Sequence, residues 1–380
     1  MNFSLTEDQL DLKKMAKDFA EKEVAPRAAD IDKEGKFPQD LFEMMTQMGF
    51  TGLCVPEEYG GSGGDDIDKV LVVEEIAKKC ASTAGTLSIH MLFASIILKF
   101  GNEEQKKRFL PDVASGGCLA AFALTEAGAG SDAGSARTTA IYDAATGEYV
   151  LNGTKCFITG GGRAKYIAVV ALTQPEKKLK GFSCIVVEQG TPGFSIGKIE
   201  EKMGLHGSET AELIFDNCRV PKANLVGEEG SGFKYAMIGL DGARIGVAAQ
   251  ALGIAEGALE ESIKYSHQRV QFGKPIADLQ GIQWYIADMA TKTEAAKLLT
   301  YYAAYLKSAG LPHSKEAAMA KLNASENARF VTNLALQIHG GYGYMKDYPM
   351  ERMYRDAKLT EIYEGTSEIH KVVIARAVMG

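Results

Sequence analysis

The sequence predicts an α+β protein of three successive regions, which are helical, then β-rich, then helical again. Apolar residues recur at helical spacing near both ends of the chain, whereas short β-rich segments separated by turn signals occupy the middle. No long amphipathic helix interrupts the middle, so we expect an antiparallel barrel-like or sandwich sheet and no βαβ units. We place the regions at residues 1–121, 122–232 and 233–380.

The first region is expected to be helical because its apolar residues lie three and four positions apart. Thr6 and Gln9 have the spacing of a capping box. The apolar stripe that follows comprises Leu12, Met15, Ala16 and Phe19. A second stripe comprises Val73, Ile76, Ala77 and Cys80, and the polar face expected opposite it carries Glu74, Glu75, Lys78 and Lys79. Residues 55–61 have the composition of a loop.

The middle region contains short segments typical of strands, at residues 149–151, 157–159, 166–170, 184–187 and 213–215. Asn152-Gly153 and Gln189-Gly190 predict turns beside them. In the last region, a helix is predicted from the spacing of Ile282, Tyr285, Ile286 and Met289. It is expected to end at Gly310, with Pro312 beyond it, and another helix is expected from about residue 314 to 337.

Composition and charge exclude several classes of function. The chain has 42 Lys and Arg against 49 Asp and Glu, a net charge of −7, which disfavours a general nucleic-acid binder. We expect no membrane span, because no run of 18 apolar residues occurs, and no secretory signal in residues 1–5. The six cysteines lack the close spacing of a zinc site, so we expect reduced core residues in a cytoplasmic protein.

Forty-one glycines mark several tight turns or close approaches. Residues 60–64 spell the Gly-x-Ser-x-Gly of hydrolases around Ser62, but no strand precedes them and a flexible loop is favoured. Residues 128–134 have one residue too many for a dinucleotide fingerprint and lie outside a βαβ unit, which rejects a Rossmann site. With Thr125 and Ser131, these residues leave two interpretations open, an anion-binding nest and a plain turn.

Glu364 is a candidate general base. It follows Ile362 and Tyr363, and a glutamate held among apolar groups has a raised pKa that suits proton abstraction near neutral pH. The alternative is an acid at a helix boundary just before a capping Thr or Ser, and the residues alone favour this second interpretation. The six histidines show no metal-ligand spacing, so no metal site is expected.

Motifs along nearly the whole chain resemble, in the same order, those of the acyl-CoA dehydrogenases. They lie at residues 55–61, 122–132, 269–274, 337–344 and 362–368. The resemblance implies an N-terminal helical domain, a middle antiparallel β-barrel-like domain and a C-terminal four-helix bundle. It also implies FAD as the cofactor and an acyl-CoA thioester as the substrate.

In this family the residue matching Glu364 removes the pro-R α-proton while the β-hydrogen passes as hydride to flavin N5. The Glu364 N–H and a flavin ribityl hydroxyl are implied to stabilise the thioester oxygen. The residues implied to contact FAD are Phe122, Leu124, Thr125, Gly130, Ser131, Phe157, Thr159, Arg269, Phe272, Gln280, Gln337, Gly340, Gly341, Thr366 and Glu368. Those implied to contact the substrate are Ser131, Asp241, Gly242, Ala243, Arg244, Gln250, Thr360 and Gly365.

Part of the implied flavin set, namely Arg269, Phe272, Gln280 and residues 337–341, matches positions that reach the FAD of a neighbouring subunit. The resemblance therefore implies a homo-oligomer, usually a tetramer. The family's usual electron acceptor, electron-transfer flavoprotein, is the expected partner. Two departures from many members are Phe157 in place of Trp, which loses the indole N–H, and Glu368 in place of Gln.

The resemblance also bears on chain length. Gln250 and Thr360 resemble the polar cavity floor of the short-chain branch, and burying polar groups against a long alkyl tail costs hydrogen bonds. Butyryl-CoA is therefore the expected substrate, with crotonyl-CoA as its product or, in reverse, its precursor. Glutaryl-CoA or branched acyl-CoA specificity and an oxidase using oxygen are alternatives. An esterase or thioesterase using Ser62 and a silent acyl-CoA-binding homologue are two further classes. The loop context of Ser62 argues against the first, and Glu364 with the flavin motifs argues against the second.

Overall fold

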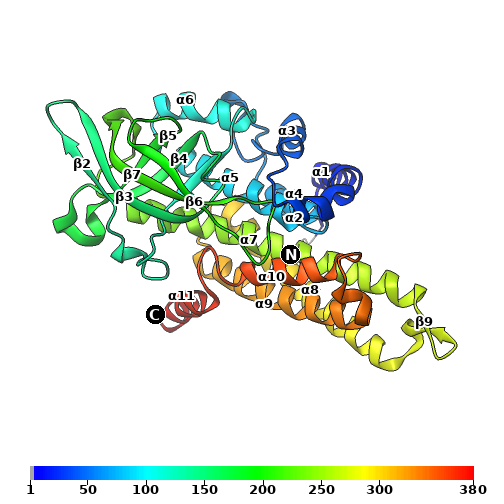
Figure 1. The fold of residues 1–380 in the computed structure, drawn as a ribbon. Coiled ribbons are helices and arrows are strands. Elements are labelled where there is room, and N and C mark those ends of the chain that lie inside the picture. The colour runs from blue at the N-terminus through cyan, green and yellow to red at the C-terminus, as the bar shows by residue number, and fades with distance from the viewer. Residues whose placement is uncertain (1–3) are drawn as a thin grey trace.

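A computed structural model describes residues 4–380 and has helical, β-rich and helical regions in the predicted order (Figure 1). Residues 1–3, part of the segment expected to lack a secretory signal, lie outside the described residues. The helices of the first region are α1 (Glu7–Phe19), α2 (Ala28–Glu34), α3 (Gln39–Gln47), α4 (Asp66–Ala77), α5 (Ala81–Phe100) and α6 (Glu103–Ala114).

The capping box predicted at the start of α1 is confirmed. The Thr6 N–H donates to Gln9 Oε1 at 3.1 Å, and the Gln9 N–H donates to Thr6 Oγ1 at 3.2 Å. In the apolar stripe of α1, Ala16 and Phe19 are buried, but Met15 is 39% exposed. The stripe is therefore narrower than its spacing predicts.

The polar face predicted for α4 is wrong, because this helix is buried on both sides. Glu74 is 0% exposed and Glu75 is 2% exposed. The helix packs against α1 on one side and against α7 (Gly232–Gln268) on another. Its buried charges are paired, with Lys13 Nζ 2.8 Å from Glu74 and Lys78 Nζ 2.7 Å from Glu256. The charged face of α4 thus meets other helices instead of water.

Helix α5 is the one helix in residues 4–380 that is long and apolar enough to cross a membrane. Within the protein, however, 89% of its most apolar window is buried. It packs against α4, α6, α7 and β1 (Ala120–Ala123), so it forms part of the hydrophobic core.

The β-rich region forms one sheet, which lies at the left in Figure 1. Its other strands are β2 (Thr139–Asp143), β3 (Glu148–Thr159), β4 (Tyr166–Leu172), β5 (Phe182–Glu188), β6 (Phe194–Ile199), β7 (Thr210–Pro221) and β8 (Leu225–Val226). The spatial order is β6-β7-β3-β2-β4-β5-β8, with β1 beside β4. Most neighbours are antiparallel, as predicted, but β1 and β2 both pair with β4 in parallel, so the sheet is mixed.

The turn predicted at Asn152-Gly153 is wrong. Strand β3 continues through both residues, and its register with β7 shifts between Leu151 and Gly153, which marks a β-bulge. A Cβ on Gly153 would lie 2.6 Å from the Thr138 hydroxyl, so glycine is needed there for close approach. The turn predicted at Gln189-Gly190 is confirmed.

The last region is helical, as predicted. Its first three helices are longer than those of the first region, also as predicted. It comprises α7, α8 (Gln280–Ser308), α9 (Ser314–His339), α10 (Met350–Thr360) and α11 (Ser367–Met379). Helix α8 ends before Gly310, which has a φ of +68°, and α9 ends at Gly340. Of the predicted stripe in α8, Met289 is buried but Tyr285 is 38% exposed. A short hairpin of β9 (Val270–Gln271) and β10 (Lys274–Pro275) lies at the far end of α7 from the sheet (Figure 1).

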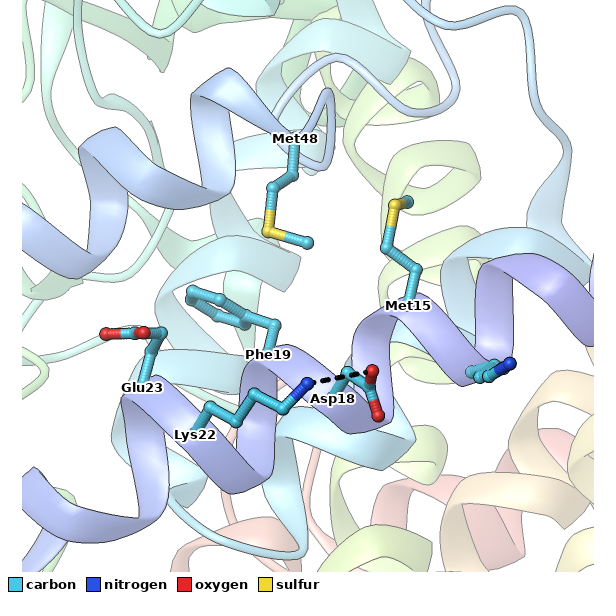
Figure 2. Close-up of a pocket in the computed structure, with 7 residues that line it drawn as sticks. Met15, Asp18, Phe19, Lys22, Glu23 and Met48 are labelled. Carbon is cyan, nitrogen blue, oxygen red and sulfur yellow. Dashed lines mark hydrogen bonds and ion pairs between the residues drawn. The ribbon is translucent and has the colours of Figure 1, made fainter.

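A shallow pocket of about 430 Å³ lies between α1 and the end of α3 (Figure 2). Its floor is apolar, with Met15, Phe19 and Met48, and its rim carries the ion pair of Lys22 with Asp18. None of its lining residues is a predicted site residue, so this pocket is separate from the candidate site.

Candidate active site

Glu364 lies on a strained turn between α10 and α11. Its φ of +54° is in the left-handed region, which a residue with a side chain rarely adopts, and Gly365 follows with a φ of +103°. The Thr366 hydroxyl then caps α11 by accepting from the Ile369 N–H at 3.4 Å. The two interpretations of Glu364 are therefore compatible, because the acid precedes a capped helix and also sits in unusual backbone.

The carboxyl group of Glu364 is in a low-dielectric setting. Burial raises its pKa to about 7, while the cations of Arg244 and Lys321 act in the opposite direction. Its Oε2 atom is buried and has no hydrogen-bond partner among the described residues. A buried, unpartnered carboxylate oxygen is costly unless a ligand uses it, so this atom is the centre of the candidate site.

Helix α7 supplies the predicted substrate segment. Arg244 is buried, its Nη1 lies 2.5 Å from Asp241 Oδ1, and its Nε has no hydrogen-bond partner in the described part of the chain. The backbone of Gly242 is held by a hydrogen bond, because the buried Lys69 donates to its carbonyl at 3.4 Å. The charge of Arg244 acts on Glu364, whereas Ala243 next to it is packed in the core.

Gln250 and Thr360 also lie beside the Glu364 turn, as predicted, but not as unsatisfied polar groups. Gln250 donates to the Ala81 carbonyl at 2.8 Å and accepts from the Tyr363 hydroxyl. Thr360 donates to the Ala357 carbonyl at 2.7 Å. Since these hydrogen bonds are already made, the cost of breaking hydrogen bonds that the sequence led us to expect does not arise.

The first predicted flavin motif is fastened to strand β3. Lys155 Nζ donates to the Leu124 carbonyl at 2.8 Å and pairs with Glu126 at the same distance. The Cys156 N–H donates to the Thr125 carbonyl at 2.9 Å. These bonds hold the segment after β1 beside the end of β3, although the two lie about thirty residues apart in the sequence.

This corner of the sheet fits a large planar ligand. Phe157 is 63% exposed with a φ of +59°, and Thr159 is half-buried on the same strand. A Cβ on Gly128 or Gly130 would meet nothing within 4 Å, so the loop has open space beside it. An exposed ring next to an open loop is what a flavin would cover. Ser131 is exposed on this loop, and Phe122 and Leu124 are buried behind it.

The second predicted flavin set gathers elsewhere, around the β9–β10 hairpin. Arg269 lies 5.4 Å from the ring of Tyr342, and both line a pocket of about 560 Å³ together with Gly340 and Gly341. Phe272 is 90% exposed at the tip of the hairpin. Gln280 and Gln337 are also exposed.

The two flavin sets lie far apart in one chain. Helix α7 has 37 residues, which corresponds to a length of about 55 Å. It begins against Ser183 of the sheet and ends next to Arg269. The hairpin and the sheet consequently occupy opposite ends of the molecule (Figure 1).

Two residues beside Glu364 were missed by sequence reasoning. Lys321, on α9, is 0% exposed, and its Nζ donates to the Gly365 carbonyl at 2.6 Å. His370, on α11, is buried, and a Cβ on Gly365 would lie 3.1 Å from its ring. Both residues fall on the inner faces of helices, and that periodicity was their only signal. Thr366 is partly buried and Glu368 is exposed.

The hydrolase interpretation of Ser62 fails on its context. The Ser62 hydroxyl donates to the Gly49 carbonyl at 3.0 Å, in a loop between a 3-10 turn at Glu57–Tyr59 and α4. A nucleophile elbow needs a strand before the serine, and none precedes it among the described residues. Residues 60–64 are a loop, as favoured.

Comparison with known proteins defines the class. Three domains of the acyl-CoA dehydrogenase family match in order: the N-terminal domain at residues 6–117, the middle domain at 121–218 and the C-terminal domain at 230–379. The chain belongs to the acyl-CoA dehydrogenase family, and it is an enzyme of that family with its three-domain fold.

Its relatives lie in the short-chain part of the family. It is 67% identical to the acryloyl-CoA reductase (NADH) of Anaerotignum propionicum, over 100% of this chain and 96% of the relative. It is 49% identical to a short-chain specific acyl-CoA dehydrogenase of Clostridium acetobutylicum, over 99% of each.

Among solved structures, butyryl-CoA dehydrogenase from Megasphaera elsdenii matches with a TM-score of 0.98 and 48% identity, over 100% of both chains. A chain from a study of the electron-transferring flavoprotein of Acidaminococcus fermentans and flavin-based electron bifurcation has the same TM-score at 51% identity, also over 100% of both chains. The chain is thus similar to butyryl-CoA dehydrogenase in fold and sequence.

Proposed function

We propose that this protein catalyses the flavin-dependent α,β-dehydrogenation of a short-chain acyl-CoA, with Glu364 as the base that takes the α-proton. The observation that carries the proposal is the buried Glu364 Oε2 atom, which has no partner and sits on a strained turn. A base for a weakly acidic C–H must be desolvated to gain strength yet stay partly ionised. Burial raises the pKa of Glu364 to about 7, which meets both needs at neutral pH.

The protein's own groups would orient the thioester. The Glu364 N–H is proposed to donate to the thioester oxygen, where negative charge develops as the α-proton leaves. Gly365 has no side chain and lets the thioester lie against the turn. Arg244, with its unpaired Nε, is proposed to face the CoA part of the substrate together with Ser131 and residues 241–243.

FAD, when bound, supplies the acceptor for the β-hydrogen. The proposed holding residues in one chain are Phe122, Leu124, Thr125, Gly130, Ser131, Phe157, Thr159, Thr366 and Glu368. The exposed ring of Phe157 and the open loop at Gly128 and Gly130 support this placement. A planar ligand at this corner would cover the exposed ring of Phe157.

We further propose that Arg269, Phe272, Gln280, Gln337, Gly340 and Gly341 serve the FAD of a second subunit. Their separation from the sheet by the length of α7, about 55 Å, supports a flavin site that two copies complete, and hence a homo-oligomer such as a tetramer. A phenylalanine that is 90% exposed also favours burial against another copy.

Butyryl-CoA is the proposed substrate. The volume of Gln250 and Thr360 beside the Glu364 turn supports a short acyl chain, and so does the likeness to short-chain enzymes. A second candidate is the reverse reaction on a three-carbon substrate, because the 67% identical relative is an acryloyl-CoA reductase. In that direction Glu364 would donate its proton to the α-carbon.

We also propose electron-transfer flavoprotein as the redox partner, supported by the neighbour from the Acidaminococcus fermentans study. A cytoplasmic location is supported by six free cysteines. The domain limits at 1–121, 122–232 and 233–380 remain our proposed division of the chain.

An anaerobic titration tests the function. The purified yellow enzyme is mixed with butyryl-CoA or, for comparison, with octanoyl-CoA, and the flavin absorbance is followed. The reduced enzyme is mixed separately with acryloyl-CoA, and the same absorbance is followed. The proposal expects bleaching by butyryl-CoA and little by octanoyl-CoA. Purified protein without flavin, or flavin that no short-chain thioester bleaches, contradicts it.

A further inference from the structure

A buried lysine lies beneath the Glu364 turn. Lys321 is 0% exposed on α9, and its Nζ donates to the Gly365 carbonyl at 2.6 Å. This bond joins α9 to the segment between α10 and α11. Burying an ammonium group is costly because it loses its hydration, so a buried lysine needs compensating contacts.

The first role of Lys321 is mechanical. Glu364 and Gly365 both have positive φ, at +54° and +103°, and such backbone persists only where its surroundings hold it. The Gly365 carbonyl is held by Lys321, and the ring of His370 packs against the same glycine. Lys321 therefore fixes the part of the turn that immediately follows the base.

The second role of Lys321 is electrostatic. Lys321 and Arg244 are the two cations that act on the Glu364 carboxylate. Arg244 is already engaged with Asp241 at 2.5 Å, whereas Lys321 has no carboxylate of residues 4–380 within ion-pair distance. The titratable and charged groups that face Lys321 are Glu364 and Glu361 from the turn, Glu368 and His370 from α11, and Arg244 from α7.

The remaining neighbours contribute little to this balance. Glu361 is paired with Arg329 at 2.6 Å and with Lys358 at 2.5 Å. Glu368 is exposed to solvent. Burial lowers the pKa of His370 to about 3, with Lys321 and Arg244 adding to the effect, so the ring is neutral at pH 7. Burial lowers the pKa of Lys321 itself to about 7, while the Glu364 carboxylate acts in the opposite direction, so the two groups balance each other's charge near neutral pH.

We propose that Lys321 is a positioning residue for Glu364: its bond to the Gly365 carbonyl keeps the base on its turn, and its ammonium form favours the ionised carboxylate before acyl-CoA binds. The inference rests on the proposed function, in which the α-proton passes from the substrate carbon to a Glu364 oxygen. Lys321 takes no proton in that step. Its effect is exerted through Glu364 alone.

Two variants separate the mechanical role of Lys321 from its electrostatic role. Lys321→Gln removes the charge but keeps a donor for the Gly365 carbonyl, whereas Lys321→Met removes both at similar length. Lys202→Gln is the matched control, since Lys202 also donates to a backbone carbonyl, that of Ser208 at 2.8 Å, but does not act on Glu364. Each holoenzyme is titrated by infrared spectroscopy, with Glu364→Gln subtracted to isolate the Glu364 carboxyl band. The pH profile of kcat/KM with butyryl-CoA is the second readout.

Both Lys321 variants are expected to raise the pKa of Glu364 by about one unit or more and to move the acid limb of kcat/KM to higher pH. Only Lys321→Met is expected to lower the plateau kcat, by roughly tenfold or more, through loss of the turn. Infrared titrations that coincide with wild type overturn the proposal. If Lys321→Met does not fold, the Gln variant still decides the charge role.

The infrared readout needs no turnover. An enzyme whose Glu364 titrates as expected, but whose flavin is never bleached by a short-chain thioester, would overturn the proposed function and leave the Lys321 inference standing. The reverse pattern, bleaching with an unchanged Glu364 titration in both variants, would overturn the inference alone.

Discussion

The Tyr363 hydroxyl donates to the side-chain oxygen of Gln250, and the Gln250 amide donates in turn to the Ala81 carbonyl at 2.8 Å. These two hydrogen bonds join the turn that carries Glu364 to α7 and α5. Gln250 is 0% exposed, and its amide nitrogen and its side-chain oxygen each have a hydrogen-bond partner. It therefore occupies space beside the turn. Its volume is therefore the feature expected to limit the acyl chain.

Gln250→Ala should shift the enzyme towards longer chains. The smaller side chain leaves room beside the Glu364 turn, and one methylene more or less in an apolar pocket changes specificity by about tenfold or more. We expect the ratio of kcat/KM for hexanoyl-CoA to that for butyryl-CoA to rise by about that factor. Ser262→Ala is the control, because Ser262 is buried on the same helix and bonded within it. An unchanged ratio in Gln250→Ala contradicts a volume limit at this residue.

Lys155→Met should release the first flavin motif. Lys155 is 0% exposed, and without it the buried side of Glu126 and the Leu124 carbonyl lose a partner. Breaking a buried pair costs about 3–5 kcal/mol, so the midpoint of urea unfolding should move to a lower urea concentration. The flavin-to-protein ratio should also fall. Arg219→Met, which removes an exposed ion pair with Asp143 on the same sheet, should cost about 1 kcal/mol or less. Equal effects of the two variants would refute a special role for Lys155.

Phe272→Asp should weaken the association of subunits. The ring is 90% exposed, so the charge costs a single chain almost nothing, but it would oppose burial against a second copy. Light scattering should give a smaller mass, and flavin should be lost on gel filtration. Leu10→Asp, on an α1 residue that is 54% exposed, serves as the comparison. A Phe272→Asp protein with wild-type mass and flavin content would mean that the hairpin does not complete a flavin site.

His90 should make stability depend on pH. Burial lowers its pKa to about 4, and its ring bridges the Val113 carbonyl and the Ala120 N–H. The folded state thus binds its proton less readily than the unfolded state, whose pKa is about 6.5. The associated stability is complete above pH 6.5 and is lost as the pH falls towards 4, by up to about 3 kcal/mol. His90→Gln should flatten the fall in Tm between pH 6.5 and 4, and an identical slope would exclude His90 as its source.

The sequence predicted the order of regions and the capping box at Thr6 because both depend on nearby residues. The sequence-based predictions failed where packing between distant segments determines the structure. Glu74 and Glu75 look solvent-exposed by spacing, yet α1 and α7 cover them. Asn152-Gly153 looks like a turn, but Gly153 serves a close approach to Thr138, which no local pattern encodes.

The candidate site likewise depends on contacts between segments that are distant in the sequence. The residues alone favoured a helix-boundary acid at Glu364, and the burial that raises its pKa to about 7 comes from the fold, since Ile362 is itself 48% exposed. The positive φ of Glu364 and its unpartnered oxygen depend on how α9 and α11 meet around the turn. Lys321 lies 43 positions before Glu364 in an ordinary helical pattern, so only the folded chain shows that they are neighbours.

The central claim is that Glu364 accepts the α-proton, and Glu364→Gln tests it most directly. The amide keeps the shape of the side chain and removes the base, so FAD should stay bound in wild-type amount. In an anaerobic stopped-flow experiment with butyryl-CoA, the rate of flavin bleaching should fall by about 10³-fold or more. Bleaching by the FAD-loaded variant at a rate near that of wild type would contradict the assignment of Glu364 as the base.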